Sequence, residues 1–183
     1  VSATLNDNGG RFGAVVSNSQ GMAVSLPATL TVTTNRAPVA AISSPGGGAS
    51  YAAGMAIYFA GSGTDPDSGV LPASAFTWRI DFHHDTHTHP ALPPTTGITS
   101  GSYLIPSVGE TSANVWYRVH LTVRDAGGLT HSVFRDVVPR RSTLTLQTNP
   151  PGLTVTLDGQ PLATPSSIQA VVGVRRTLGV VSP

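Results

Sequence analysis

The stretch DFHHDTHTHP, residues 81–90, holds four of the chain's six histidines. In an extended segment alternate side chains point to the same side, which places His83, Asp85, His87 and His89 together. Three imidazoles and a carboxylate suit zinc or another transition metal. We therefore hypothesise a metal site in this loop. Two other interpretations fit the same residues: a polar hairpin whose His and Thr side chains bond the backbone and Asp85, or a pH-sensitive loop.

A group of aspartates indicates a second metal candidate. Asp65 and Asp67 precede Gly69 in one loop, and Asp125 lies in another. Calcium takes about six to eight oxygen ligands from carboxylates, carbonyls and water, so three aspartates from adjacent loops would begin a calcium site. The alternative is turn formation, because Asp-Pro and Asp-Ser-Gly sequences commonly form turns.

The composition excludes several other chemistries. The chain has no Cys, which excludes disulfides and thiolate ligands. A net charge of +1, with no basic run longer than two residues, gives no case for nucleic acid. No apolar stretch approaches the roughly 20 residues that span a membrane. No serine-nucleophile elbow, phosphate loop or HExxH helix is present, so we predict no catalytic residues and no enzymatic activity.

Short alternating strands are expected to position these groups. Gly, Pro, Ser, Thr and Val are abundant, and no long segment shows helical periodicity. In residues 76–82 and 117–123 every second side chain is apolar, which is typical of strands with one buried face. The first of these strands places Trp78 in the core. The sequence therefore predicts an all-β fold.

Residues 38–138 resemble a PKD domain, a small immunoglobulin-like β-sandwich. The resemblance rests on PVA at 38–40, YFAGSGTDPDSG at 58–69, FTWRIDF at 76–82 and YRVHLTVRDAGG at 117–128. It departs from the family where a Phe-Gly-Asp-Gly turn usually follows the Trp strand. The histidine cluster and a Pro-rich excursion stand there instead.

Partial β modules are expected on both sides of the sandwich. Residues 1–35 predict a hairpin that resembles the last two strands of an immunoglobulin-like domain. Residues 142–183 resemble the start of a PEGA-type β module, with turns at Asn149–Gly152 and at Asp158-Gly159. The order of modules is similar to the C-terminal tails of secreted bacterial glucose/sorbosone (PQQ-type) sugar dehydrogenases. We expect the chain to be a piece of such a longer precursor.

The resemblance also implies where the polar side chains lie. In an immunoglobulin-like sandwich, strands 76–82 and 117–123 are antiparallel neighbours, so their outward side chains share one face. We expect an ion pair of Asp81 with Arg118 or Arg79 on that face. An exposed indole there could stack a sugar ring; alternatively, the 84–114 excursion covers it. The candidate ligand-binding residues are Trp116, Arg118, His120, Arg79 and Asp81.

From these patterns we expect a non-catalytic extracellular or cell-surface segment of a secreted bacterial protein. It would space or attach a catalytic domain to polysaccharide or to the cell surface. The alternatives are a metal-binding module centred on the histidine loop, with Zn²⁺ or Ca²⁺ as its ion, and an assembly segment that self-associates through exposed strand edges. The expected partners are glycans and other domains of the same precursor.

Overall fold

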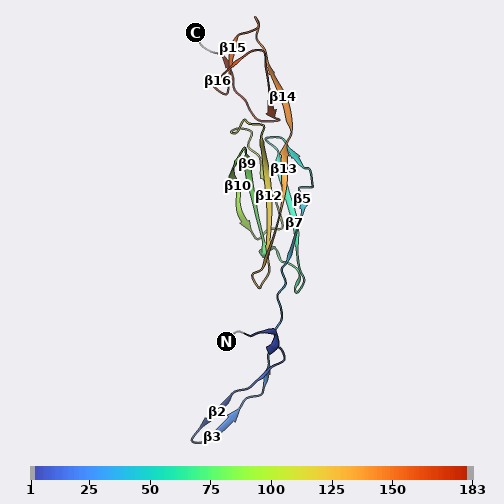
Figure 1. The fold of residues 1–183 in the computed structure, drawn as a ribbon, viewed down its shortest axis with the longest axis vertical. Coiled ribbons are helices and arrows are strands. Elements are labelled where there is room, and N and C mark those ends of the chain that lie inside the picture. Colours follow the sequence, from blue (N-terminus) through green and yellow to red (C-terminus); the bar gives the residue numbers. More distant parts are fainter. Residues whose placement is uncertain (1–2, 181–183) are drawn as a thin grey trace. The chain divides into compact units, whose positions relative to one another are not determined.

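The computed structural model describes residues 3–180 and divides into two compact units, Val1–Arg36 and Ala37–Pro183. Its described elements are β-strands and two short 3-10 turns, Leu5–Asp7 and Ala73–Ala75, which confirms the predicted all-β class. The expected module boundary at 35–38 falls at the division between the units. The expected boundary at 139–142 lies within the second unit (Figure 1).

The first unit is a hairpin. Strand β2 (Val15–Asn18) pairs with β3 (Gly21–Val24), and β1 (Arg11–Phe12) pairs with β4 (Ala28–Thr29). The Oδ1 atom of Asn18 closes the turn by accepting hydrogen bonds from the backbone N–H groups of Gln20 and Gly21. None of the described residues of this unit is buried. The hairpin thus has a regular backbone without a core of its own, which is a marginal structure in water.

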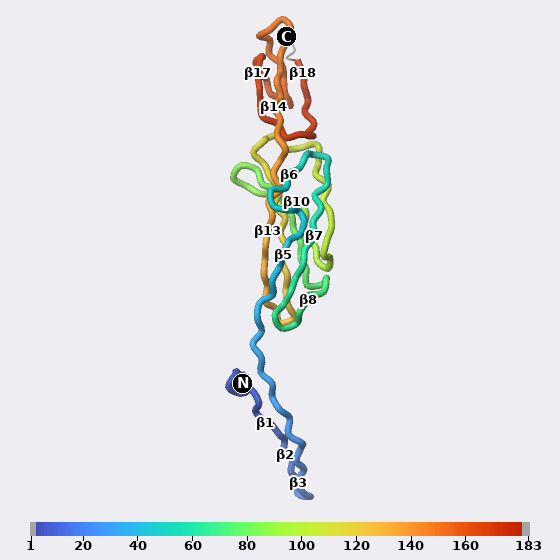
Figure 2. Tube along the Cα trace, turned by 90° about the vertical axis from the view of Figure 1, so that its right-hand side faces the viewer, coloured from blue at the N-terminus to red at the C-terminus, as the bar shows by residue number. Residues whose placement is uncertain are grey.

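Two sheets build the sandwich of the second unit. The strand order of the first sheet is β10 (His87–Thr96), β9 (Phe76–His84), β12 (Val115–Arg124), β13 (Thr130–Pro139) and β6 (Ser50–Tyr51). The second sheet has the order β11 (Ser100–Leu104), β7 (Ala56–Asp65) and β5 (Val39–Ser44), with β8 (Gly69–Val70) paired to β7. Figure 2 shows β5, β7 and β8 along one side of this sandwich.

Alternation along β9 and β12 fills the space between the sheets. No surface is exposed on Trp78 and Ile80 of β9 or on Leu121 of β12. The ring centroids of Trp78 and of Phe59 in the opposite sheet are 4.8 Å apart. The Trp78 indole N–H donates to the carbonyl of Ile98 at 3.0 Å, so this buried donor is satisfied. The predicted core position of Trp78 is confirmed.

The Pro-rich excursion extends the sandwich at its edges. Strand β10 pairs antiparallel with β9, whereas β11 pairs with β7 of the other sheet. Strand β10 is the edge of its sheet and holds Pro90, Pro93 and Pro94, which fits an edge because proline has no N–H for a further strand. The alternative that this excursion covers the outward face of β9 and β12 is therefore wrong.

The C-terminal strands continue from the sandwich within the same unit. Strand β14 (Arg141–Leu146) pairs with β17 (Ser166–Val171), and β15 (Thr154–Leu157) pairs with β16 (Gln160–Ala163) and β18 (Leu178–Val180). The predicted Asp158-Gly159 turn joins β15 and β16, with positive φ at both residues. Backbone bonds from Ala53 N–H to the Val172 carbonyl and from Arg175 N–H to the Ser107 carbonyl, both 2.8 Å, tie these strands to the sandwich.

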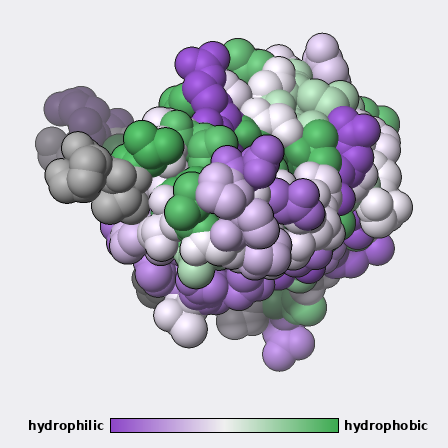
Figure 3. Space-filling model, turned by 90° about the horizontal axis from the view of Figure 1, so that it is seen from above, coloured by the Kyte–Doolittle hydropathy of each residue, from purple (hydrophilic) through white to green (hydrophobic). Residues whose placement is uncertain are grey.

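The surface is mixed in character. On the face drawn in Figure 3, hydrophobic and hydrophilic residues are interspersed. None of the helical segments within residues 3–180 has the length and apolar character of a membrane span.

Candidate metal centre

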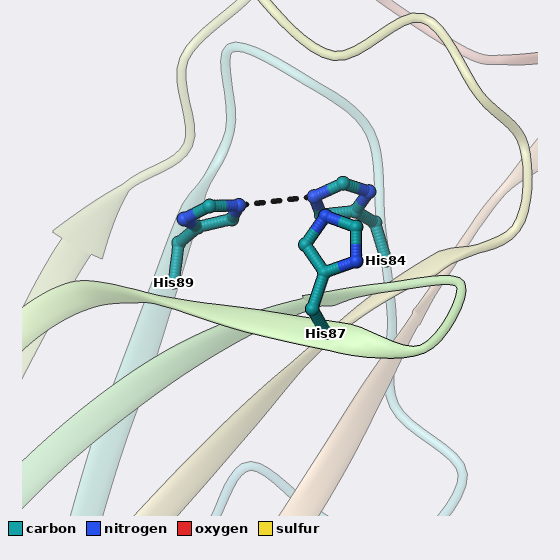
Figure 4. A group of neighbouring side chains, drawn as sticks. All are labelled: His84, His87 and His89. Atoms are coloured by element: carbon teal, nitrogen blue, oxygen red, sulfur yellow. Dashed lines mark hydrogen bonds between the residues drawn. The ribbon is translucent and has the colours of Figure 1, made fainter.

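Three histidines gather at the β9–β10 hairpin. His84 is the last residue of β9, and His87 and His89 belong to the start of β10. One ring nitrogen from each lies within 4.8 Å of the others, and Nε2 of His84 is 3.0 Å from Nε2 of His89. Figure 4 shows the three imidazoles together on one side of the hairpin. Within residues 3–180, this is the one group of three or more His, Asp or Glu side chains placed to share an ion.

The hairpin turn explains why these three histidines meet. Asp85 and Thr86 form the turn, with Asp85 in the left-handed region at φ +46°. The register then sets His87 opposite His84 and His89 opposite Phe82. Directly paired residues of an antiparallel ladder share a face. The histidines therefore extend the inward-facing row of β9 beyond the apolar core, and the His84 ring lies 6.0 Å from that of Phe82.

The predicted ligand set of His83, Asp85, His87 and His89 is not assembled. His83 pairs with Thr88 on the opposite face of the hairpin, and its ring stacks on Trp116 at 4.7 Å. The Asp85 carboxylate accepts the side-chain amide of Asn114 at 2.9 Å. The prediction treated the segment as continuously extended, whereas the turn reverses the chain. His84 therefore replaces His83 and Asp85 in the cluster.

Two residues that the sequence analysis did not indicate, His84 and Glu110, belong to this candidate site. Glu110 lies in the loop between β11 and β12, and its Oε2 is 3.7 Å from Nδ1 of His84. Its Oε1 accepts the backbone N–H of Ser112 at 2.7 Å, which fixes the carboxylate. A carboxylate facing the second nitrogen of a ligating imidazole orients the ring and raises its basicity. Nothing in the sequence pattern places this loop beside the hairpin.

The cluster suits a four-coordinate transition metal. Two imidazole nitrogens bound to a tetrahedral zinc ion at about 2.0–2.1 Å lie roughly 3.3 Å apart. Nε2 of His84 and Nε2 of His89, which form a hydrogen bond at 3.0 Å, are near that separation, and all three ring nitrogens lie within 4.8 Å of one another. Three imidazoles leave one coordination position for water or another ligand. Imidazole donors suit zinc, copper, iron and nickel, whereas calcium and magnesium prefer oxygen.

The outward face of β9 and β12 carries a charged network. Asp81 pairs with Arg79 at 2.9 Å, which confirms one of the two expected ion pairs, and also contacts Nε2 of His120 at 3.0 Å. Arg118 does not pair with Asp81. It instead makes a two-point contact with Asp136 of β13 at 2.7 and 2.9 Å, because β13 lies on its other side.

Burial and charge shift the titration of this network. Burial lowers the pKa of His120, and the positive charge of the neighbouring Arg79 lowers it further. Burial also lowers the pKa of His83, and the positive charge of Arg118 adds to this effect. The hydrogen bonds from Arg118 lower the pKa of Asp136. Both histidines therefore favour the neutral form, while the Arg118–Asp136 pair stays charged.

Trp116 is not an open stacking platform. His83 covers one face of its ring, and its indole nitrogen is buried without a hydrogen-bond partner. A shallow hollow of about 540 Å³ lies on the same surface. Its charged and titratable lining comprises Arg79, Asp81, His83, His89, Arg118 and His120. This hollow can offer hydrogen bonds to a polar ligand but no exposed indole.

Two of the three aspartates of the calcium hypothesis, Asp65 and Asp125, hydrogen-bond within their own loops. Asp65 is buried, and its Oδ1 accepts the N–H groups of Asp67 and Ser68 and the Ser68 hydroxyl. Its Oδ2 is buried without a partner. Asp125 is buried and accepts the N–H of Leu129 at 2.8 Å. Within the described residues these carboxylates are not arranged as ligands of one ion.

No family model matches this chain, and no curated protein resembles it significantly.

Proposed function

We propose that this chain is a non-catalytic β-sandwich module that binds one transition-metal ion, with zinc as the expected ion, through His84, His87 and His89. The observation that carries the proposal is the convergence of three ring nitrogens within 4.8 Å. The position of Glu110 against His84 supports it, because that carboxylate favours the tautomer that ligates through Nε2. A bound ion would cross-link β9 to β10 at the end of their hairpin.

The module would serve as an accessory segment of a larger secreted bacterial protein, at the cell surface or outside the cell. The sequence resemblance of residues 38–138 to PKD domains and of 142–183 to PEGA-type modules supports this role. The antiparallel pairing of β9 with β12 is compatible with an immunoglobulin-like sandwich. The C-terminal strands would space the sandwich from the rest of the precursor.

Metal content and affinity test the proposal. Untagged protein is analysed for metals by mass spectrometry, then stripped with chelator and titrated with zinc by calorimetry. His84→Gln and His83→Gln form a matched pair of neighbouring histidines on opposite faces of one strand. Loss of a supporting carboxylate alone typically costs about 10–100-fold in affinity, so loss of the His84 ligand should cost more than about 100-fold. His83→Gln should leave zinc affinity unchanged.

Two results would contradict the proposal. One is the absence of saturable one-to-one zinc binding in the wild-type protein. The other is an equal loss of affinity in both variants, because the proposed site does not use His83.

The charged hollow on the outward face favours a second function, attachment to carbohydrate. Arg79 and Arg118 offer fixed donors, and Asp81 offers an acceptor, for sugar hydroxyls. Glycan-array binding that survives chelator and falls with Arg79→Ala would support it. Binding that disappears with chelator would assign the glycan to the metal site instead.

A further inference from the structure

A small cavity adjoins the histidine cluster. It is a partly open pocket of about 200 Å³ between the end of the sandwich and the C-terminal strands. Its walls include the rings of Tyr51, Phe82, Tyr103 and Tyr117. These rings pack at centroid separations of 4.9 Å for Phe82–Tyr117, 5.1 Å for Tyr51–Tyr117 and 5.7 Å for Tyr103–Tyr117. Val171 and Val174 close the side formed by the C-terminal strands.

The cavity and the histidine cluster share two residues. His89 lines the cavity and is also a member of the cluster. Glu110 lines the cavity and faces His84 at 3.7 Å. An ion held by the three histidines would therefore border this cavity on the side of His89 and Glu110.

We propose that this cavity binds a small monocyclic monocarboxylate, whose carboxylate completes the coordination of the bound ion while its ring packs against the tyrosines. The inference rests on the metal site proposed above. The three histidine ligands, the Glu110 carboxylate and the aromatic walls together define the ligand's size, charge and shape.

Cavity size limits the ligand to one ring. An apolar cavity of about 150 Å³ takes up benzene, so about 200 Å³ accommodates one six-membered ring with one substituent. The aromatic walls favour a flat or cyclic body, since ring pairs prefer offset or edge-to-face packing.

Charge limits the ligand to one carboxylate. A divalent ion bound by three neutral imidazoles and compensated by Glu110 keeps a single positive charge. A monoanion neutralises that charge, whereas a dianion would leave an unpaired negative charge beside apolar walls, which is costly. Neutral ring compounds would gain the packing without the ion–carboxylate contact.

The tyrosine hydroxyls of the cavity wall remain protonated. Burial raises the pKa of Tyr51 to about 12 and raises the pKa values of Tyr103 and Tyr117. At neutral pH the wall is therefore uncharged, which favours one anion at the metal edge over several charges within the cavity.

Cobalt(II) in place of zinc gives a direct test. The full chain is loaded with one equivalent of cobalt, and its visible absorption bands are recorded during titration with benzoate. We expect the bands to shift saturably with benzoate. Acetate, which lacks the ring, and benzamide, which lacks the charge, should each bind at least tenfold more weakly, and phthalate should be excluded by its second carboxylate.

A variant in the far wall separates the cavity from the metal site. Val174→Phe fills the cavity from the C-terminal side and touches none of the three histidines. This variant should keep the cobalt absorption bands, and its apparent affinity for benzoate should fall at least tenfold.

The outcomes distinguish the two proposals. Absence of cobalt bands in the wild-type protein overturns the metal site and this inference together. Cobalt bands that ignore benzoate, or that respond equally to acetate, overturn the cavity ligand alone. Retention of the full benzoate response in Val174→Phe also overturns it, because the ring would then lie outside the cavity.

Discussion

Nδ1 of His84 faces Oε2 of Glu110 at 3.7 Å, which links the end of β9 to the loop that leads into β12. Because Nε2 of the same ring faces His89, the two nitrogens of His84 have separate roles. One meets a carboxylate, and the other is directed at the centre of the histidine cluster. This arrangement places the loop around Glu110 beside the proposed metal centre.

Replacing Glu110 with Gln should lower zinc affinity about 10–100-fold, because His84 loses the carboxylate that orients it. Competition with a chromophoric chelator measures the change. Asp85→Asn is the matched control, since Asp85 lies next to His84 in the β9–β10 hairpin but its carboxylate contacts Asn114. Asparagine also tolerates the left-handed backbone conformation of this position. Equal effects of the two substitutions would show that general charge near the hairpin, rather than contact with His84, controls affinity.

Replacing His120 should make the free energy of unfolding depend less on pH below about pH 6.5. Burial, then Arg79, lowers the pKa of His120 below its ordinary value of 6.5. As the pH falls below 6.5 the unfolded chain takes up this proton first, so the free energy of unfolding falls until the pH passes the folded-state pKa. One such group contributes at most about 1.4 kcal/mol per pH unit.

Urea unfolding of metal-free His120→Gln and wild-type protein between pH 7 and pH 5 measures this contribution, at pH values chosen around the ordinary pKa of about 6.5. Identical slopes in the two proteins would contradict the assignment. His83→Gln should weaken the pH dependence in the same range, because burial and Arg118 also lower the pKa of His83.

The Arg118–Asp136 pair should stabilise the sheet only modestly. Its two short contacts are well formed, but the Arg118 and Asp136 side chains are 29% and 36% exposed, so solvent screens them. A double-mutant cycle with Arg118→Ala and Asp136→Ala should give a coupling energy of about 0.2–1 kcal/mol that decreases in high salt. A salt-independent coupling would indicate that the contact of Arg118 with the Phe134 ring, at 4.1 Å, dominates instead.

Gly173→Ala should disrupt the contact between the C-terminal strands and the sandwich. Gly173 has φ +87°, and a Cβ atom there would collide with the Ala53 carbonyl. Gly159→Ala is the control, because it has φ +80° with nothing within 4 Å. Both variants bear backbone strain of about 1–3 kcal/mol, and only Gly173→Ala adds the collision. Thermal unfolding should therefore show a clearly larger loss of stability for Gly173→Ala.

The alternation of apolar and polar side chains along single strands could be predicted from the sequence because it depends only on neighbouring residues. The apolar side chains of residues 76–82 and 117–123 predicted the faces of two strands and the core position of Trp78. Of the two partners expected for Asp81, Arg79 pairs with it and Arg118 does not. The Asp158-Gly159 turn was also predictable, since both residues tolerate positive φ. These features depend on neighbouring residues and on a burial pattern that repeats along one strand.

Only the tertiary structure decided which histidines form the cluster. A turn at Asp85 and Thr86 reverses the chain and changes which alternate residues share a face, so His84 joins His87 and His89 while His83 turns toward Trp116. Glu110 and Asp136 reach their partners through strand order, which no local pattern encodes. Thus the sequence by itself determined the all-β class and the alternating faces. Register and long-range packing selected the histidines that converge, because both depend on contacts between distant parts of the chain.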